Sequence, residues 1–505
     1  MSDAKDLAKP DRVRRMDVAP GSGTMAPPRA GQPTSKRRLL LIEFNELCPS
    51  LLDKWMRAGD LPNFKKFYDD SEVYVTESDE QHAPYLEPWI QWYSLHTGLS
   101  YRQHQVFNLT DGPHAGHEDM WDVLRGNGLR VANCSSMNCK GFADPNAFFL
   151  PDPWCTSERP SPEALGIFHK VVSDRVQEYS NKGTRLTAGD YVRFLWFLLS
   201  HGLHPTTIAS LVGQLVSETM SSGKTSWRRA AALDKLQFDV FRHYDKRLKF
   251  NFATFFSNST AHYQHAYWRF MEPSLFAAPN SPEEAERYRD VVKFGYQEMD
   301  KLLGRFFEFE AEDTTLVFST GLSQQPYLKY EAVGGQHFYR PRNVESLLAK
   351  LDIAYERIFP VMTHQYIAHF ADTNTKENAR RMFESILVNN DQVFGTRDGV
   401  GDSLYFGNQI TGSVPDGAVV QIPAGGNAAR EVPFYEIFYQ INEAKSGFHH
   451  PDGALWIKSG NHRVHAEKVS ILDVFPTVMD FFGVVPTSTE AAIRSGRSLW
   501  RAAHA

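Results

Sequence analysis

The sequence lacks the cysteines that would define a disulfide-bonded or zinc-ribbon protein. Of 505 residues, four are cysteine, and no two of them form a CxxC pair. So few cysteines in so long a chain exclude a disulfide framework, and the missing pair excludes a dithiol redox motif. We expect Cys48, Cys134, Cys139 and Cys155 to be reduced thiols.

Positive charge is also scarce. The chain has 54 Lys and Arg residues against 60 Asp and Glu residues, which gives a formal net charge of -6. Proteins that bind nucleic acid non-specifically depend on Lys and Arg to neutralise phosphates. We therefore expect no nucleic-acid partner and a small-molecule substrate instead.

No long uninterrupted apolar run occurs. The strongest membrane candidate, residues 191–216, is broken by Ser-His-Gly at 200–202 and by His-Pro at 204–205. A spanning helix needs about 20 mostly apolar residues, so this segment predicts two helices of a bundle and no membrane partner. Residues 1–37 are rich in Pro, Gly, Ser, Lys and Arg and lack the apolar stretch of a signal peptide. We expect them to form a disordered basic tail on a cytoplasmic protein.

Short apolar runs alternate with helical patterns along the rest of the chain. Residues 39–44 read Leu-Leu-Leu-Ile-Glu-Phe, which is typical of a buried parallel strand, and a helix is expected from about 49 to 58. The alternation predicts an α/β fold with a mostly parallel sheet sandwiched by helices. In such sheets ligands bind beyond the carboxyl ends of the strands. Further strands are expected at 129–133, 250–256, 315–319 and 454–458.

The domain organisation that we predict has an interrupted core. Residues 156–245 are helical in pattern, and residues 340–440 mix short helices and strands with glycine turns. We interpret the first as a helical cap and the second as a mixed α/β insertion, either of which could cover a site. The core then consists of residues 38–155, 246–339 and 441–505.

Reactive side chains follow the predicted strands in chain order. The first strand ends in Asn45 and Glu46, and a helix-like segment at 87–99 (EPWIQWYSLHTGL) contributes Glu87 and Gln91. Residues 260–269 (TAHYQHAYWR) place two histidines three residues apart, so that they can share one face of a helix. Later segments add Gln324 and Gln325, His449 within GFHHPDGALWI, and a closing ILDVFPTV helix at 471–478.

Taken together, these segments resemble the alkaline phosphatase superfamily, in particular its phosphodiesterase and nucleotide-pyrophosphatase branch, from about residue 38 to 500. The resemblance implies a two-metal centre, whose ions need carboxylate as well as imidazole ligands. It places His265 and His449 at metal-binding positions. However, the positions where it implies other ligands or the nucleophile hold Asn45, Pro88, Ala261, Thr320 and Gly321. A conventional two-metal phosphatase is therefore not expected.

Three alternatives remain open. In the first, His262, His265 and His449 form a rebuilt site for one zinc or another divalent metal, with Glu46 or Glu87 as base or fourth ligand. In the second, a metal-free enzyme uses Glu87, His82, His265, His449 and Asp452 for acid–base catalysis. In the third, the protein is an inactive pseudo-phosphatase that serves in binding or assembly.

Of these, we favour an enzyme, a hydrolase or transferase, that acts on a small polar substrate such as a phosphorylated or sulfated compound. The expected catalytic residues are Glu87, Asn45 and Glu46, and the expected metal ligands are His265, His449 and His262. Gln91, Gln324 and Gln325 are expected to bind substrate. The sequence leaves the cofactor and the oligomeric state open.

Overall fold

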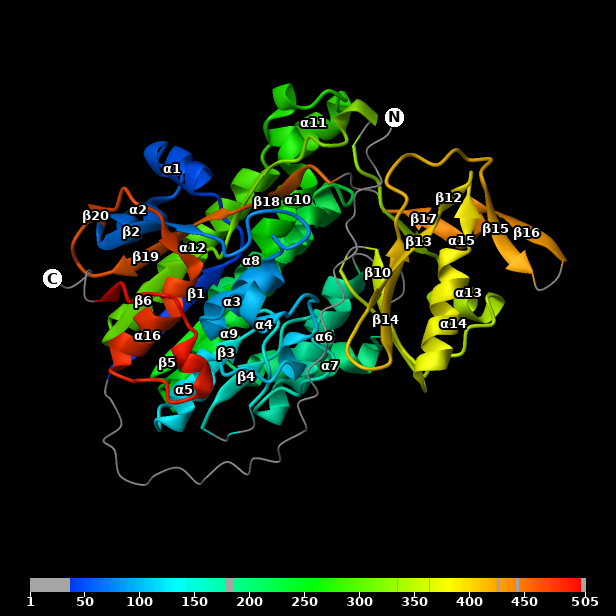
Figure 1. Cartoon of the computed structure of the whole chain (residues 1–505). Coiled ribbons are helices and arrows are strands. Elements are labelled where there is room, and N and C mark those ends of the chain that lie inside the picture. The colour runs from blue at the N-terminus through cyan, green and yellow to red at the C-terminus, as the bar shows by residue number, and fades with distance from the viewer. Residues whose placement is uncertain are drawn as a thin grey trace. The chain divides into compact units, whose positions relative to one another are not determined.

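The computed structural model describes residues 37–142, 144, 146–178, 186–333, 335–362, 364–424, 427–441 and 445–500 (Figure 1). The predicted basic tail lies outside these residues, apart from Arg37.

A nine-stranded sheet forms the centre of the described chain. Its strand order is β20-β2-β19-β6-β1-β5-β3-β4, with β21 paired to β2. Neighbouring strands are parallel except for β19, which runs antiparallel to both β2 and β6. The predicted α/β fold with a mostly parallel sheet is confirmed. The strands are β1 (Arg38–Phe44), β2 (Ser71–Glu77), β3 (Val131–Cys134), β4 (Phe148–Leu150), β5 (Phe252–Ser257), β6 (Thr314–Ser319), β19 (Asp452–Lys458), β20 (Arg463–Val464) and β21 (Val469–Ser470).

Helices cover both faces of this sheet (Figure 1). Successive side chains of β1 alternate between two buried cores: Leu40 and Ile42 belong to one, Leu39 and Leu41 to the other. A strand buried on both faces needs a continuous apolar run, which is what the sequence supplies. The first core contains side chains of α1 (Pro49–Arg57), α2 (Pro62–Asp69), α9 (Arg229–Leu248), α10 (Ser259–Met271) and α12 (Val291–Glu310), and the second those of α3 (Pro88–Thr97), α5 (Met120–Gly126) and α16 (Val474–Phe482).

The helical segment before α9 consists of α6 (Gly166–Glu178), α7 (Ala188–Ser200) and α8 (Pro205–Met220). The chain breaks between α7 and α8, as the sequence predicts. Much of the apolar surface of both helices is exposed; Trp196, for example, is 73% exposed. Within the described residues, every helix is too short or too polar to cross a bilayer.

Residues 339–440 build a separate apolar core (Figure 1, yellow to orange). One four-stranded sheet has the order β13-β14-β10-β9 and another β12-β11-β15-β16. The elements of residues 339–440 are β8 (Tyr339–Pro341), α13 (Val344–Lys350), β9 (Arg357–Pro360), β10 (Gln365–His369), α14 (Thr373–Glu384), β11 (Leu387–Val388), β12 (Asp391–Gln392), β13 (Phe394–Asp398), β14 (Ser403–Asn408), β15 (Val419–Ala424), β16 (Asn427–Pro433), α15 (Phe434–Ile437) and β17 (Phe438–Gln440).

Candidate metal centre

The turn after β1 carries the first two predicted site residues. Asn45 N–H donates to the carbonyl of Ser257 (3.0 Å) and Glu46 N–H to the carbonyl of Thr320 (3.0 Å), so the ends of β5 and β6 hold this turn. Glu46 adopts φ 62°. This left-handed conformation costs a residue other than glycine about 1 kcal/mol or more, and such strain concentrates at functional sites. The turn is therefore held in place against its own backbone preference.

The carboxylate of Glu46 lies beside two histidines from distant segments. Its Oε2 is 3.3 Å from Nε2 of His265, on α10, and 3.7 Å from Nε2 of His449, on β18 (Gly447–His450). One ligand atom from each of the three residues lies within 4.8 Å of the others. The structure thus groups His265 and His449 as the sequence predicts, with Glu46 as the third member.

Hydrogen bonds orient this group. Nδ1–H of His265 donates to the carbonyl of Gly447 (2.9 Å), and its Nε2 faces Glu46. Glu46 Oε1 accepts from Nδ2 of Asn45 (2.8 Å), and Oε2 accepts from Nε2 of Gln324 (2.6 Å). Nδ1 of His449 lies 3.5 Å from Oε2 of Glu87. Hydrogen bonds therefore orient Glu46 and His265, whereas Nδ1 of His449 is buried without a hydrogen-bond partner.

Burial and charge set the protonation states. Burial acts to raise the pKa of Glu46, but His265 and His449, with the hydrogen bonds from His265 and Gln324, hold it at about 2. Burial lowers the pKa of His449 to about 3, against the opposing pull of Glu46. An ionised carboxylate and a neutral imidazole are the forms that bind a metal ion.

Glu87 occupies a different electrostatic setting beside His449. It precedes α3, where Pro88 takes the first helical position, and its side chain is 23% exposed. Burial raises the pKa of Glu87 to about 7, with Lys445 and Arg397 opposing the rise and Glu46 adding to it. The sequence interpretation missed both cations. Lys445 could have been noticed two residues before the Gly447 motif, whereas Arg397, on β13, follows no recognisable motif.

The remaining predicted residues have other surroundings. His262 lies outside the Glu46, His265 and His449 group. Its ring packs edge-on against Tyr267 at 6.5 Å between centroids, and burial lowers its pKa to about 4. Both ends of the Gln91 amide bind backbone, at Asp79 N and Tyr85 O.

The two glutamines of β7 (Ser323–Pro326) differ in their access to the centre. Gln324 reaches it directly, and its Oε1 is buried without a hydrogen-bond partner. Gln325 Nε2 donates to the carbonyl of His449 (3.1 Å), and its side chain is otherwise exposed.

Trp92 fills the space beside the altered strand ends. Its Nε1–H donates to Oδ1 of Asn45 (2.7 Å). A Cβ atom on Gly321 would lie 2.8 Å from the indole, so no larger residue fits there without displacement. Two positions where the resemblance implies lost ligands, Asn45 and Gly321, are therefore packed against one buried ring. Within the part of the chain that the structure describes, neither position adds a ligand to the Glu46, His265 and His449 group.

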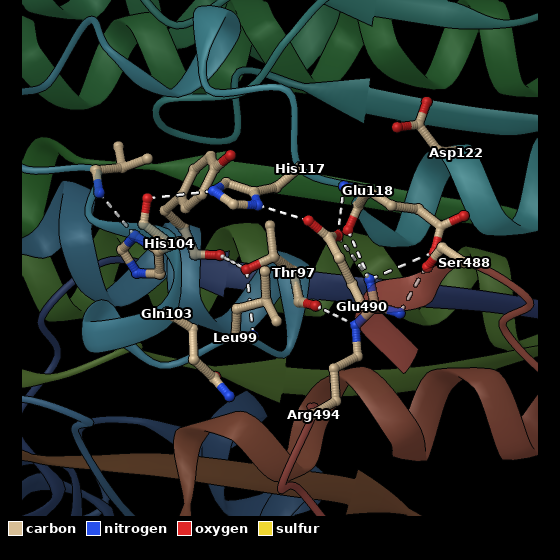
Figure 2. Close-up of polar contacts among 12 residues, drawn as sticks. Thr97, Leu99, Gln103, His104, His117, Glu118, Asp122, Ser488, Glu490 and Arg494 are labelled. Carbon is tan, nitrogen blue, oxygen red and sulfur yellow. Dashed lines mark hydrogen bonds and ion pairs between the residues drawn. The ribbon is translucent and has the colours of Figure 1, made fainter. Parts of the chain in front are cut away.

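A polar network fixes the end of α3 that is remote from Glu87. Figure 2 shows the guanidinium of Arg494 between Thr97 and Glu118. Arg494 donates to the carbonyls of Thr97 (2.7 Å) and Glu118 (2.9 Å) and lies over the ring of Phe475 at 4.2 Å. His117 is hydrogen-bonded to Glu490 (2.6 Å) in the same network. The C-terminal segment therefore holds the helix that positions Glu87.

No family model and no curated protein matches this chain. Among solved structures, it is similar to phosphonoacetate hydrolase from Sinorhizobium meliloti 1021, with a TM-score of 0.38 and 13% identity over 92% of this chain and 97% of the other. It is also similar to human ectonucleotide pyrophosphatase/phosphodiesterase 5, with a TM-score of 0.35 and 8% identity over 93% and 99% of the two chains. The murine protein gives 0.37 and 9% with the same coverage. Because these TM-scores are low, the fold is defined here by this chain's own strand order and contacts.

Proposed function

We propose that this chain is a hydrolase of the alkaline phosphatase superfamily type with one divalent metal ion, zinc, bound by Glu46, His265 and His449. The observation that carries the proposal is the convergence of three ligand atoms: Nε2 of His265 and Nε2 of His449 lie 3.3 and 3.7 Å from Oε2 of Glu46. Two histidines with one glutamate form a recognised catalytic zinc set, which keeps a fourth position open.

The donor distances fit such an ion. Zinc bonds of about 2.0–2.2 Å in tetrahedral geometry separate neighbouring ligand atoms by about 3.3 Å. His265 and Glu46 have the outer hydrogen bonds, to Gly447 and from Asn45, that metal ligands need to hold their orientation. The unpaired, buried Oε1 of Gln324 is a further polar atom whose burial costs free energy unless a ligand or ion satisfies it.

A bound zinc ion would supply Lewis-acid polarisation and a nucleophile at neutral pH. The chain's own residues would do the rest. Glu87 can hold a proton at Oε2 and release it to a leaving group, because it is partly exposed and lies beside His449. Lys445 and Arg397, whose charges act on Glu87, would attract an anionic substrate.

The substrate class that suits this arrangement is a small phosphate or sulfate ester. The site offers cations for the anionic group and a carboxylic acid for the departing alcohol. Asn45 is held by Trp92 and Glu46, so we assign it to orienting Glu46. Glu46 itself, with its low pKa, suits a ligand better than a base.

An activity screen tests the proposal. The chelator-treated chain would be assayed on phenyl phosphate, diphenyl phosphate and phenyl sulfate, whose phenol group needs a proton to leave, with and without added zinc. We expect zinc-dependent turnover of at least one ester, and a fall in kcat of about 100-fold or more in Glu87→Gln with zinc content unchanged. Turnover that persists in chelator, or an unchanged kcat in Glu87→Gln, would contradict the assignment.

One observation favours the alternative of an inactive binding protein. Pro88 stands where the resemblance implies the attacking hydroxyl, and it serves as the first residue of α3. Zinc binding at the three ligands without turnover of any ester would support this alternative.

A further inference from the structure

Among the described residues, two consecutive helices carry most of the exposed large apolar side chains. Ten of the 17 exposed large hydrophobic residues found among the described residues lie between Tyr191 and Met220. Scattered exposed hydrophobics are ordinary, but a concentration of this kind marks an interaction surface. The ten are Tyr191, Val192, Leu195, Trp196 and Leu199 on α7, and Ile208, Val212, Leu215, Val216 and Met220 on α8.

The exposed residues form a stripe on each helix. On both helices they recur at intervals of three and four residues, which places them along one side. The opposite sides hold the helices to the core: Phe197 and Leu198 of α7 are buried in it, and Ser210 of α8 accepts a hydrogen bond from Lys235 of α9 (2.7 Å). The exposed stripes are therefore presented by anchored helices.

The segment that carries these stripes has more cations than acids, and both of its acids are in ion pairs. Residues 188–229 contain four Lys or Arg residues and two acids, in a chain whose net charge is -6. Asp190 is 2% exposed and paired with Lys170 and Arg193, and Glu218 is 8% exposed and paired with Arg229. The side chains of Arg193 and Arg229 are themselves 70% and 68% exposed. Four Lys or Arg residues against two acids leave residues 188–229 with a formal charge of +2, opposite in sign to that of the whole chain.

We propose that α7 and α8 dock this chain on the surface of an anionic lipid bilayer. Helices of 13 and 16 residues are about 20 and 24 Å long, short of the roughly 30 Å hydrocarbon core, so they would lie in the interface. Trp196 and Tyr191 are ring types that favour that depth. This proposal replaces the sequence-based prediction of no membrane partner.

A lipid surface suits these stripes better than a second copy of the chain. A two-fold dimer places the same patch on both subunits, so it would bring the excess positive charge of residues 188–229 toward its own copy. Anionic headgroups would instead balance this excess charge while the apolar stripes enter the acyl boundary.

Vesicle sedimentation of the full chain tests the proposal. Vesicles of phosphatidylcholine with one third phosphatidylglycerol would be compared with phosphatidylcholine alone. We expect binding to the anionic vesicles, a salt-dependent preference for them, and a blue shift of tryptophan fluorescence. The double variants Trp196→Ser/Leu199→Ser and Leu215→Ser/Val216→Ser should each weaken binding about tenfold or more. Each variant removes two apolar side chains that the bilayer would bury.

The variants change exposed side chains, so the fold should tolerate them. The control Val485→Ser/Ile493→Ser alters two equally exposed apolar residues elsewhere, 78% and 50% exposed, and should bind like the unmodified chain. The proposal is overturned if the chain stays in the supernatant with both vesicle types, or if the control loses as much binding as the helix variants. A concentration-dependent dimer that Trp196→Ser/Leu199→Ser abolishes, without vesicle binding, would identify a second copy as the occupant instead.

Discussion

At the scale of single residues, the sequence singled out all three members of the proposed centre, but it grouped His262 with His265 and His449 as ligands. His265, His449 and Glu46 could be singled out because each lies in a segment that the resemblance marks: on α10, on β18 and directly after β1. The exclusion of His262 from the group could not be predicted, because it depends on how α10 turns relative to β18. The contact between Trp92 and Gly321 could not be predicted either, because only tertiary packing shows which ring fills the space beside Gly321.

The contact between Gly321 and Trp92 can be measured as stability. In Gly321→Ala the new Cβ would lie 2.8 Å from the indole at φ +69°, whereas in Gly59→Ala, at φ +79°, it meets nothing within 4 Å. Both variants bear the backbone strain of about 1 kcal/mol, and overpacking adds about 1–3 kcal/mol at Gly321 alone. We expect a lower thermal midpoint for Gly321→Ala than for Gly59→Ala. Equal midpoints would show that Trp92 does not occupy this space.

A buried carboxyl outside the centre should make stability depend on pH. Asp234 accepts hydrogen bonds from Ser257 and Ser259, and burial raises its pKa from 3.8 to about 6. The folded state then binds the proton more tightly than the unfolded state, so stability falls as pH rises from about 4 to about 6, by at most about 3 kcal/mol.

The variant Asp234→Asn removes this titration. Its thermal midpoint relative to the unmodified chain should rise between pH 4 and pH 7, whereas the exposed control Asp53→Asn should show no such trend. Parallel pH profiles for Asp234→Asn and the unmodified chain would contradict the raised pKa.

At the scale of elements, the apolar runs predicted the central strands well. β1, β5, β6 and β19 lie within two residues of the expected ranges, because a strand buried on both faces leaves a continuous apolar signal. The strand β2 (SEVYVTE) was not predicted, because polar residues interrupt its apolar pattern. Its place beside β19 is decided by pairing, which no local pattern reveals.

The network around Arg494 holds α3 and should be important for stability. Arg494→Ala would remove its bonds to Thr97 and Glu118 and its contact with Phe475, at a cost of about 1–3 kcal/mol, because its side chain is only 7% exposed. The control Arg57→Ala breaks a surface pair with Asp53 in which Arg57 is 79% exposed, and should cost about 0.5 kcal/mol or less. Thermal unfolding measures both, and a loss in Arg494→Ala no larger than in the control would show that the network does not clamp α3.

At the scale of the whole molecule, the centre joins segments from widely separated parts of the chain. Glu46 follows β1, His265 lies on α10, His449 lies on β18, and Arg397 comes from the separate core of residues 339–440. A ligand that binds only this folded arrangement must stabilise it by mass action. We therefore expect zinc at 100 times its Kd to raise the apparent stability by about 2.7 kcal/mol, seen as a higher thermal midpoint.

Zinc stoichiometry tests the central claim most directly. The chelator-treated chain would be titrated with zinc, together with Glu46→Gln, which keeps the size of the side chain, and His262→Ala as the matched control. We predict one zinc per chain for the unmodified protein and for His262→Ala, and at least 100-fold weaker binding for Glu46→Gln. Three results would contradict the proposed centre: no zinc binding by the unmodified chain, loss of zinc binding in His262→Ala, or unchanged zinc binding in Glu46→Gln.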